Sequence, residues 1–81
     1  MGKKYKSSYC NIYDNETMDF IDDYFVTYHS LKDLQKQIKD YMEVSVQHID
    51  FMLEVDGKLV VTDVKDFNQL LHNKVYLHAY V

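Results

Sequence analysis

A chain of 81 residues is long enough for one small domain with a modest core and too short for several domains. Thirteen acidic and nine basic residues give a formal net charge of −4 at pH 7, which disfavours direct nucleic-acid binding. No apolar run approaches the roughly 20 residues of a membrane-spanning helix. We therefore expect a single domain over residues 1–81, soluble and cytoplasmic, with no membrane association.

Several residue types are absent, and their absence narrows the possible chemistry. The single cysteine, Cys10, excludes an internal disulfide and a multi-cysteine zinc site, so we expect a small apolar strand residue. All basic residues are lysines, so bidentate guanidinium contacts to phosphate cannot form. No phosphate-binding glycine loop, nucleophile elbow or metal-binding histidine spacing is present. We expect no enzyme activity, no cofactor and no metal.

The N-terminal third carries weak strand signals. Residues 1–8 are polar and basic and are expected to be flexible. Residues 9–13 are rich in strand-forming types, and 14–16 form a polar turn. Residues 17–28 would be a long strand whose apolar positions change parity near 22–23, where we expect a bulge. Which parity faces the core stays open.

The clearest element is an amphipathic helix at about residues 30–43. Ser30 is a good N-cap, and Asp33 stands three residues later, as in a variant of the capping box. Apolar residues then recur at helical spacing, namely Leu31, Leu34, Ile38, Tyr41 and Met42. We expect this stripe to pack on one face of a sheet.

The C-terminal half begins with a hairpin signal. Residues 49–55 alternate between apolar and polar types, the pair Asp56-Gly57 follows, and 58–62 is again strand-like. An Asp-Gly pair favours a two-residue turn because both residues tolerate positive φ. Asp63 is expected to cap a short helical turn near 63–71.

The last predicted strand separates two kinds of residue. Strand side chains alternate between faces, so one face would carry Val75, Leu77, Ala79 and Val81 and the other Tyr76, His78 and Tyr80. The order strand, strand, helix, strand, strand, short helix, strand predicts an α+β fold. It would have a mixed sheet of four or five strands with the main helix packed across it.

Residues 30–81 resemble the ubiquitin-like β-grasp superfamily. The likeness lies in the helix opening at 30–40, the strand, turn and strand at 49–59, the small helix at 64–71 and the closing strand at 74–81. The resemblance implies a ubiquitin-like β-grasp scaffold that works by protein–protein contact. The chain ends without the Gly-Gly tail of conjugated modifiers, so conjugation is not expected.

Another branch with this fold, the Phox-and-Bem heterodimerisation domains, has an acidic motif around a similar turn. A partial match is formed by Glu54, Asp56, Asp63 and Asp66. Lys58 stands where that motif has an acidic residue.

Two surfaces are candidate binding sites. The first is the sheet face opposite the helix, which should carry Met52, Tyr76, His78 and Tyr80. Tyrosine combines a large apolar area with a polar tip, and methionine adapts to a partner's shape. In a chain with eight tyrosines, exposure of some by chance is the alternative.

The second candidate is an acidic block between Ser7 and Leu31. The block contains no lysine and five acidic residues, namely Asp14, Glu16, Asp19, Asp22 and Asp23. Such a block could enter a basic groove, or it could be a solvated strand edge that resists aggregation.

These surfaces lead to two functional hypotheses. The first is a non-catalytic module that binds a protein partner through the sheet face. The second is a small acidic inhibitor that blocks a nucleic-acid-binding host or defence protein. The composition, with eight tyrosines, nine lysines, no arginine and one alanine, suits an AT-rich genome such as that of a low-GC bacterium, its phages or some protozoa. The chain would be a monomer, or a homodimer joined through the edge of the 9–13 strand.

Overall fold

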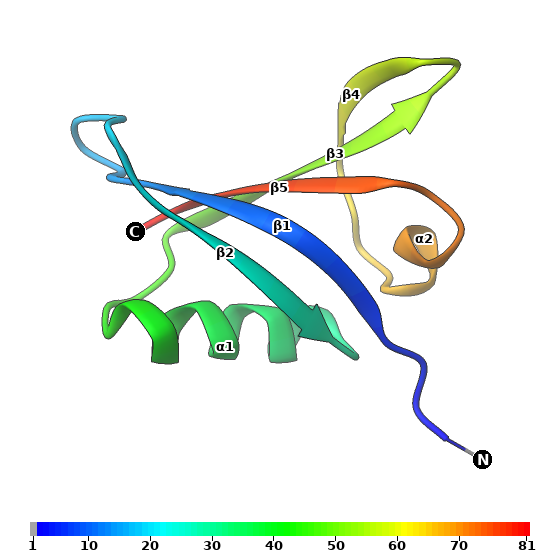
Figure 1. The fold of residues 1–81 in the computed structure, drawn as a ribbon, viewed down its shortest axis with the longest axis horizontal. Helices are drawn as coiled ribbons and strands as arrows, with labels where there is room; N and C mark the ends of the chain where they lie inside the picture. Colours follow the sequence, from blue (N-terminus) through cyan, green and yellow to red (C-terminus); the bar gives the residue numbers. More distant parts are fainter. Residues whose placement is uncertain (1) are drawn as a thin grey trace.

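Five segments rich in β-branched and aromatic residues form strands, and an amphipathic segment after the second strand forms the one long helix. The computed structural model describes residues 2–81 (Figure 1). Its elements are β1 (Lys6–Tyr13), β2 (Phe20–Tyr28), α1 (Leu31–Met42), β3 (His48–Val55), β4 (Lys58–Thr62), α2 (Asn68–Leu71) and β5 (Val75–Tyr80). The predicted α+β class with one main helix is confirmed, and the arrangement is compatible with a β-grasp-like fold.

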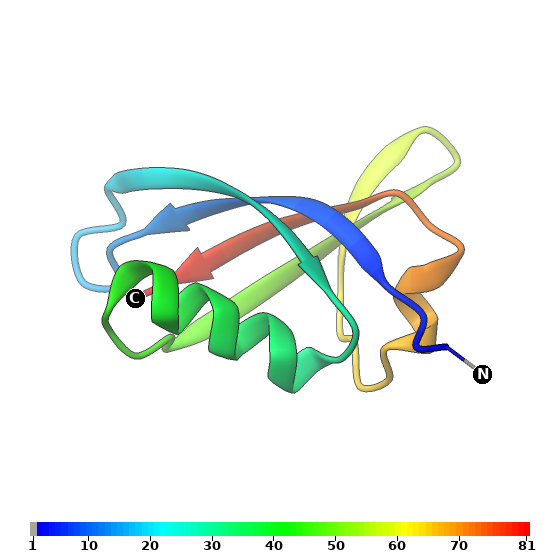
Figure 2. The same cartoon turned by 60° about the horizontal axis from the view of Figure 1, so that its bottom comes forward.

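The strands form one mixed sheet in the order β2-β1-β5-β3-β4. β5 is last in the chain but central in the sheet, where it runs parallel to β1 and antiparallel to β3. α1 lies across one face, which we call the inner face (Figures 1 and 2). The opposite face is the outer face. Because β1 lies between β2 and β5, the predicted dimer contact through the 9–13 strand is wrong.

The predicted helix is confirmed, and its first turn is capped. The Ser30 hydroxyl accepts a hydrogen bond from the backbone N–H of Asp33 at 3.0 Å. The Asp33 carboxylate in turn accepts from the N–H of His29 at 3.1 Å, one residue before the position of a standard capping box. The helix ends at Glu43, a left-handed residue whose N–H donates to the carbonyl of Lys39.

The core lies between α1 and the inner face. The helix contributes Leu34 and Ile38, both fully buried, while Tyr41 remains 45% exposed and lies at the margin. The strands, α2 and the segment between β4 and α2 contribute the other buried apolar residues, namely Cys10, Ile12, Val26, Tyr28, Leu53, Val64, Leu70, Val75, Leu77 and Ala79. Phe51 packs against this cluster, and the predicted packing of the helix stripe on one face of the sheet is confirmed.

The first hairpin differs from its prediction in where its strands begin. β1 begins at Lys6, so Lys6 to Ser8 belong to the sheet and not to a flexible segment, while residue 1 lies outside the described residues. β2 begins at Phe20, and the bulge predicted near 22–23 is found at Ile21, next to Asp22. From Asp22 onward the even-numbered positions of β2 face inward.

The second hairpin follows its prediction, but the short helix does not begin as expected. Asp56 and Gly57 have φ values of 50° and 77° and form the predicted turn. The helical part of 63–71 is limited to α2, and Asp63 is remote from its first turn. The N-cap residue of α2 is Phe67, whose side chain makes no capping bond, and the carboxylate of the preceding Asp66 accepts a hydrogen bond from the N–H of Asn68 at 3.1 Å.

Candidate protein-binding face

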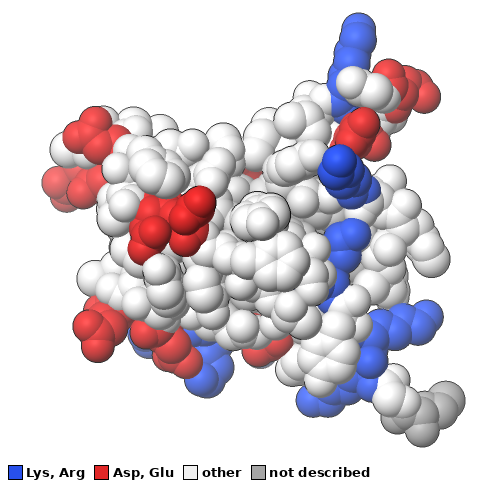
Figure 3. Space-filling model, viewed as in Figure 1, with Lys and Arg blue, Asp and Glu red and all other residues white. Residues whose placement is uncertain are grey.

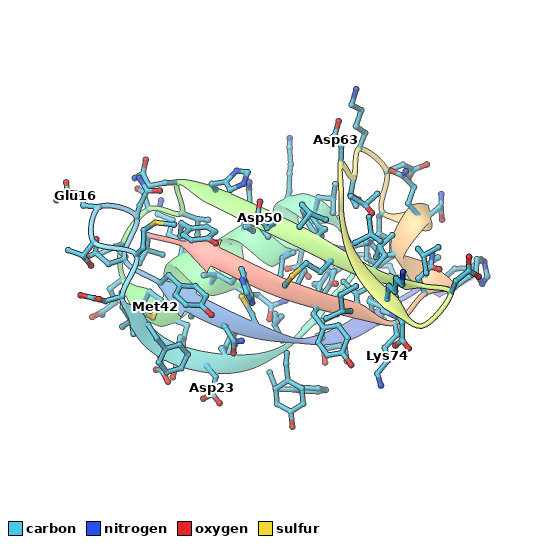
Figure 4. All side chains as sticks on the ribbon, turned by 90° about the horizontal axis from the view of Figure 1, so that it is seen from above. Glu16, Asp23, Met42, Asp50, Asp63 and Lys74 are labelled. Carbon is cyan, nitrogen blue, oxygen red and sulfur yellow. The ribbon has the colours of Figure 1, made fainter. Side chains whose placement is uncertain are left out.

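The outer face carries the predicted sheet-face residues. Met52, Tyr76, His78 and Tyr80 are all half-buried and share this face, because Met52 pairs with Tyr76 across the β3–β5 ladder. Figure 4 views the sheet from the side opposite α1 and shows the outer side chains pointing toward the reader. These four residues therefore lie on the face where they were predicted. The structure places further residues beside them that the sequence did not identify.

The first addition is an apolar row that crosses all five strands. Its members are Phe25, Tyr9, Tyr76, Met52 and Val61, in the order β2, β1, β5, β3, β4. Tyr9 on β1 is 63% exposed and Val61 on β4 is 64% exposed, so the row is open to solvent on both sides of the central strand β5. The rings of Tyr9 and Phe25 meet edge to face, with centroids 4.8 Å apart. We call these five residues the apolar row.

A second group of aromatic residues lies nearer the end of β1. The ring of Tyr13 stacks on Tyr80 at 5.6 Å, meets Phe20 edge to face at 5.8 Å and lies 5.0 Å from the ring of His78. His48 stacks on the other side of Tyr80 at 5.9 Å. These contacts fix the rings in place, which lowers the conformational entropy that a partner would have to remove on binding.

Asp50 is the acidic residue inside this aromatic group. It pairs with His78 across the ladder, and its carboxylate forms a hydrogen bond with the His48 imidazole. Partial burial, followed by the negative charge of Asp50, raises the pKa of the Tyr80 hydroxyl. The Tyr80 hydroxyl is therefore a neutral hydrogen-bond donor at ordinary pH, beside the polar side chains of Asp50 and His78 on the same face.

A groove borders the outer face where β4 separates from β3. It has a volume of about 410 Å³ and lies between the first half of β3 and the segment 61–64. Ile49 and Phe51 line it from β3, and Val61 connects it with the apolar row. A side chain of a bound partner has space here.

The structure separates the five acids of the second candidate site. Glu16 and Asp19 lie in or beside the turn between β1 and β2, where the Asp14 carboxylate accepts hydrogen bonds from the N–H groups of Glu16 and Thr17. Asp22 faces inward and accepts a hydrogen bond from the Tyr41 hydroxyl at 2.7 Å. Asp14 and Asp22 therefore have structural partners within the chain.

Acidic side chains nevertheless gather at one end of the molecule. Figure 3 shows them at the end of the β1–β2 turn, whereas lysines and acidic side chains are mixed at the opposite end. The mixed end includes Lys6 and Lys74, near the starts of β1 and β5, and the Lys6 ammonium donates to the carbonyl of Asn73 at 2.5 Å. The end of the β1–β2 turn is therefore the more acidic end of the molecule.

The chain has a single thiol, and it is buried. Burial raises the pKa of the Cys10 thiol to about 12, so this cysteine is a core residue, as predicted. Within residues 2–81 no group of three histidine, cysteine or acidic side chains is placed to hold a metal ion. No helix in the same range has the length and apolar character needed to cross a membrane.

No family model, curated protein or solved structure matches the chain at a significant level. The case for a function therefore depends on the surfaces described above.

The sequence did not identify Tyr9, Phe25 and Val61 as members of the site. In 9–13 both parities carry apolar or aromatic residues, so alternation alone does not decide which side faces out. The structure decides it, because Ser8, Cys10 and Ile12 are buried whereas Tyr9 is 63% exposed.

Proposed function

We propose that this chain is a ubiquitin-like β-grasp module that binds a protein partner through its outer face. The order of the strands, with one long helix on the inner face, supports this assignment of the fold. One observation carries the functional proposal, namely the apolar row, which crosses every strand on a face that α1 leaves uncovered. Exposed apolar patches rimmed by polar residues mark interaction sites on small proteins.

The composition of the face fits a protein partner better than a small ligand. Tyrosine and methionine are enriched at protein interfaces, and neighbouring polar groups such as Asp50 and His78 would fix the orientation of a bound protein. The sheet face is broad, and the adjoining groove is open to it. A cytoplasmic location is in keeping with the single buried cysteine.

The test is affinity capture with matched variants. Circular dichroism first shows that each variant has the helix and strand content of the wild type. Tyr76→Ala combined with Tyr80→Ala should abolish capture of the wild-type partner, because these rings form the centre of the face. Glu16→Gln combined with Asp19→Asn should retain the partner. Retention by the tyrosine variant together with loss by the acidic variant would overturn the proposal.

A second candidate function is favoured by the acidic side chains at the end of the β1–β2 turn (Figure 3). In this alternative the acidic end enters the basic groove of a nucleic-acid-binding protein and inhibits it. Ionic strength separates the two candidates, because an electrostatic contact weakens steeply with salt whereas an apolar one changes little. Measuring affinity for the captured partner across a salt series decides between them.

A further inference from the structure

The two edges of the sheet differ in how they are covered. At the β2 edge, the Gln37 amide donates to the backbone carbonyl of Thr27 at 2.7 Å. Further along, the Tyr41 ring stacks on Tyr24 at 4.2 Å and its hydroxyl donates to Asp22. Side chains of α1 and acidic groups thus protect the β2 edge from pairing with another strand.

At the β4 edge, in contrast, the side-chain hydrogen bond found among the described residues joins the Thr62 hydroxyl to the Val60 carbonyl within the strand itself, and no helix takes part in it. Leu59, Val60 and Val61 are consecutive apolar residues that are 55%, 46% and 64% exposed. They belong to the β3–β4 hairpin, which extends away from α1 (Figure 1). Three exposed apolar residues on an edge strand form a template for pairing with a further strand.

The turn fixes which backbone groups of β4 are available. Val55 and Lys58 flank the two-residue turn and form the first cross-strand pair of the hairpin. Hydrogen-bonded pairs alternate along an antiparallel ladder, so Lys58, Val60 and Thr62 direct their N–H and C=O groups toward β3. Leu59 and Val61 direct theirs to the free edge.

We propose that a second copy of this chain occupies the β4 edge, with the two β4 strands antiparallel about Val60. This register pairs Leu59 of each copy with Val61 of the other, so the free N–H and C=O groups of both residues are satisfied. The two Val60 side chains meet on the inner side of the joined sheets. The contact is isologous, since each copy contributes the same surface.

Side-chain complementarity selects a second copy over an unrelated strand. In the antiparallel register Leu59 lies opposite Val61 of the second copy and Val60 opposite Val60, so exposed apolar residues face one another. Each Lys58 lies opposite Thr62 of the second copy, so no like charges face each other across the contact. The strand is therefore complementary to itself in its side chains as well as in hydrogen bonding.

The protected β2 edge limits assembly to two copies. Pairing through β4 uses the open edge of each sheet, and the remaining outer edges are the two covered β2 strands. A contact along five residues is small and falls among weak interfaces, so the dimer forms reversibly as concentration rises. This inference is independent of the proposed partner on the outer face.

Disulfide trapping tests the register in the full chain. Val60→Cys should give a covalent dimer under mild oxidation, because facing residues at a non-hydrogen-bonded position have Cα atoms about 4.5 Å apart. Leu59→Cys is the matched control and should cross-link much less, since Leu59 faces Val61 of the second copy. Cys10 is fully buried and does not compete. Equal cross-linking by both variants, or more by Leu59→Cys, would overturn the proposed register.

Sedimentation equilibrium tests the dimer itself. Wild-type chain should pass from monomer to dimer with concentration and form nothing larger. Val60→Glu should remain monomeric because it places two carboxylates face to face, while Val55→Glu, on the same hairpin and with similar exposure, should dimerise as the wild type does. A wild-type chain that is monomeric at millimolar concentration, or dimers that survive Val60→Glu, would refute the proposal. Tyr76→Ala should leave dimerisation unchanged.

Discussion

The hydroxyl of Tyr28 lies 3.0 Å from the hydroxyl of Ser8 inside the core, between β1 and β2. Both residues are buried, and the Tyr28 ring also meets Phe67 edge to face at 5.8 Å. Burial without a partner would be costly for either hydroxyl, and the pair satisfies both. Within the described residues no buried side-chain nitrogen or oxygen lacks a hydrogen-bond partner.

We expect Ser8→Ala to lower the free energy of unfolding by about 1–3 kcal/mol, because it leaves the Tyr28 hydroxyl buried and unsatisfied. Tyr28→Phe in the same chain removes that hydroxyl and should recover part of the loss. Urea unfolding of the two single variants and the double variant measures the coupling. If the losses in free energy of unfolding of the two single variants simply add in the double variant, the hydrogen bond between Ser8 and Tyr28 contributes nothing to stability.

Stability should fall at alkaline pH. The pKa of the Cys10 thiol is about 12 in the folded chain against a usual value of 9.0, because burial disfavours the thiolate. The stability that this shift contributes is complete below about pH 9. It is lost as the pH rises toward 12, by up to ~1.4 kcal/mol per pH unit.

Burial also raises the pKa of the Tyr28 hydroxyl, so Tyr28 likewise lowers the stability of the folded chain as the pH rises. Urea midpoints measured between pH 7 and pH 11 test the dependence. Cys10→Ala should show a shallower decline than the wild type. Identical slopes would mean that the thiol is not the titrating group.

Gly57→Ala should cost about 1 kcal/mol through backbone strain alone. Gly57 has φ of +77°, and an added Cβ there would meet nothing within 4 Å, so steric clash is not the cause. Gly2→Ala is the control, because its Cβ would also meet nothing and no strained φ is present. Thermal unfolding should separate the two variants, and equal melting temperatures would contradict a left-handed turn.

Leu70→Ala should destabilise the chain by about 2–5 kcal/mol, although α2 has only four residues. Leu70 is fully buried, whereas Leu59 is 55% exposed and serves as the matched control. Leu59→Ala should change the free energy of unfolding by less than about 0.5 kcal/mol. Similar losses in the two variants would show that α2 is not part of the core.

Patterns that depend on neighbouring residues in the sequence predicted their elements correctly. Ser30 and the stripe through Leu34 and Ile38 specify the helix because cap and periodicity are both local. Asp56-Gly57 specifies the turn because its positive φ values demand those residue types. Met52 and Tyr76 were placed on the outer face because regular alternation in β3 and β5 has a single interpretation.

The remaining features depend on contacts between distant parts of the chain. Tyr41 matches the apolar period of the helix, yet it lies beyond the edge of the sheet, where Tyr24 and Asp22 hold it. The inward parity of β2 follows from its pairing with β1, which local composition does not specify. The carboxylates of Asp63 and Asp66 are equivalent by residue type, and the path of the chain after β4 decides which of them accepts a hydrogen bond from α2.

The central position of β5 has a consequence for biosynthesis. The β1–β2 and β3–β4 hairpins do not touch through a shared ladder, and only Val75–Tyr80 connects them. A ribosome synthesises these residues after all the others of the sheet, so both hairpins are made before the strand that joins them. Folding must therefore wait for the arrival of a single short strand, and a nascent chain that stalls before it presents two unjoined halves to chaperones and proteases.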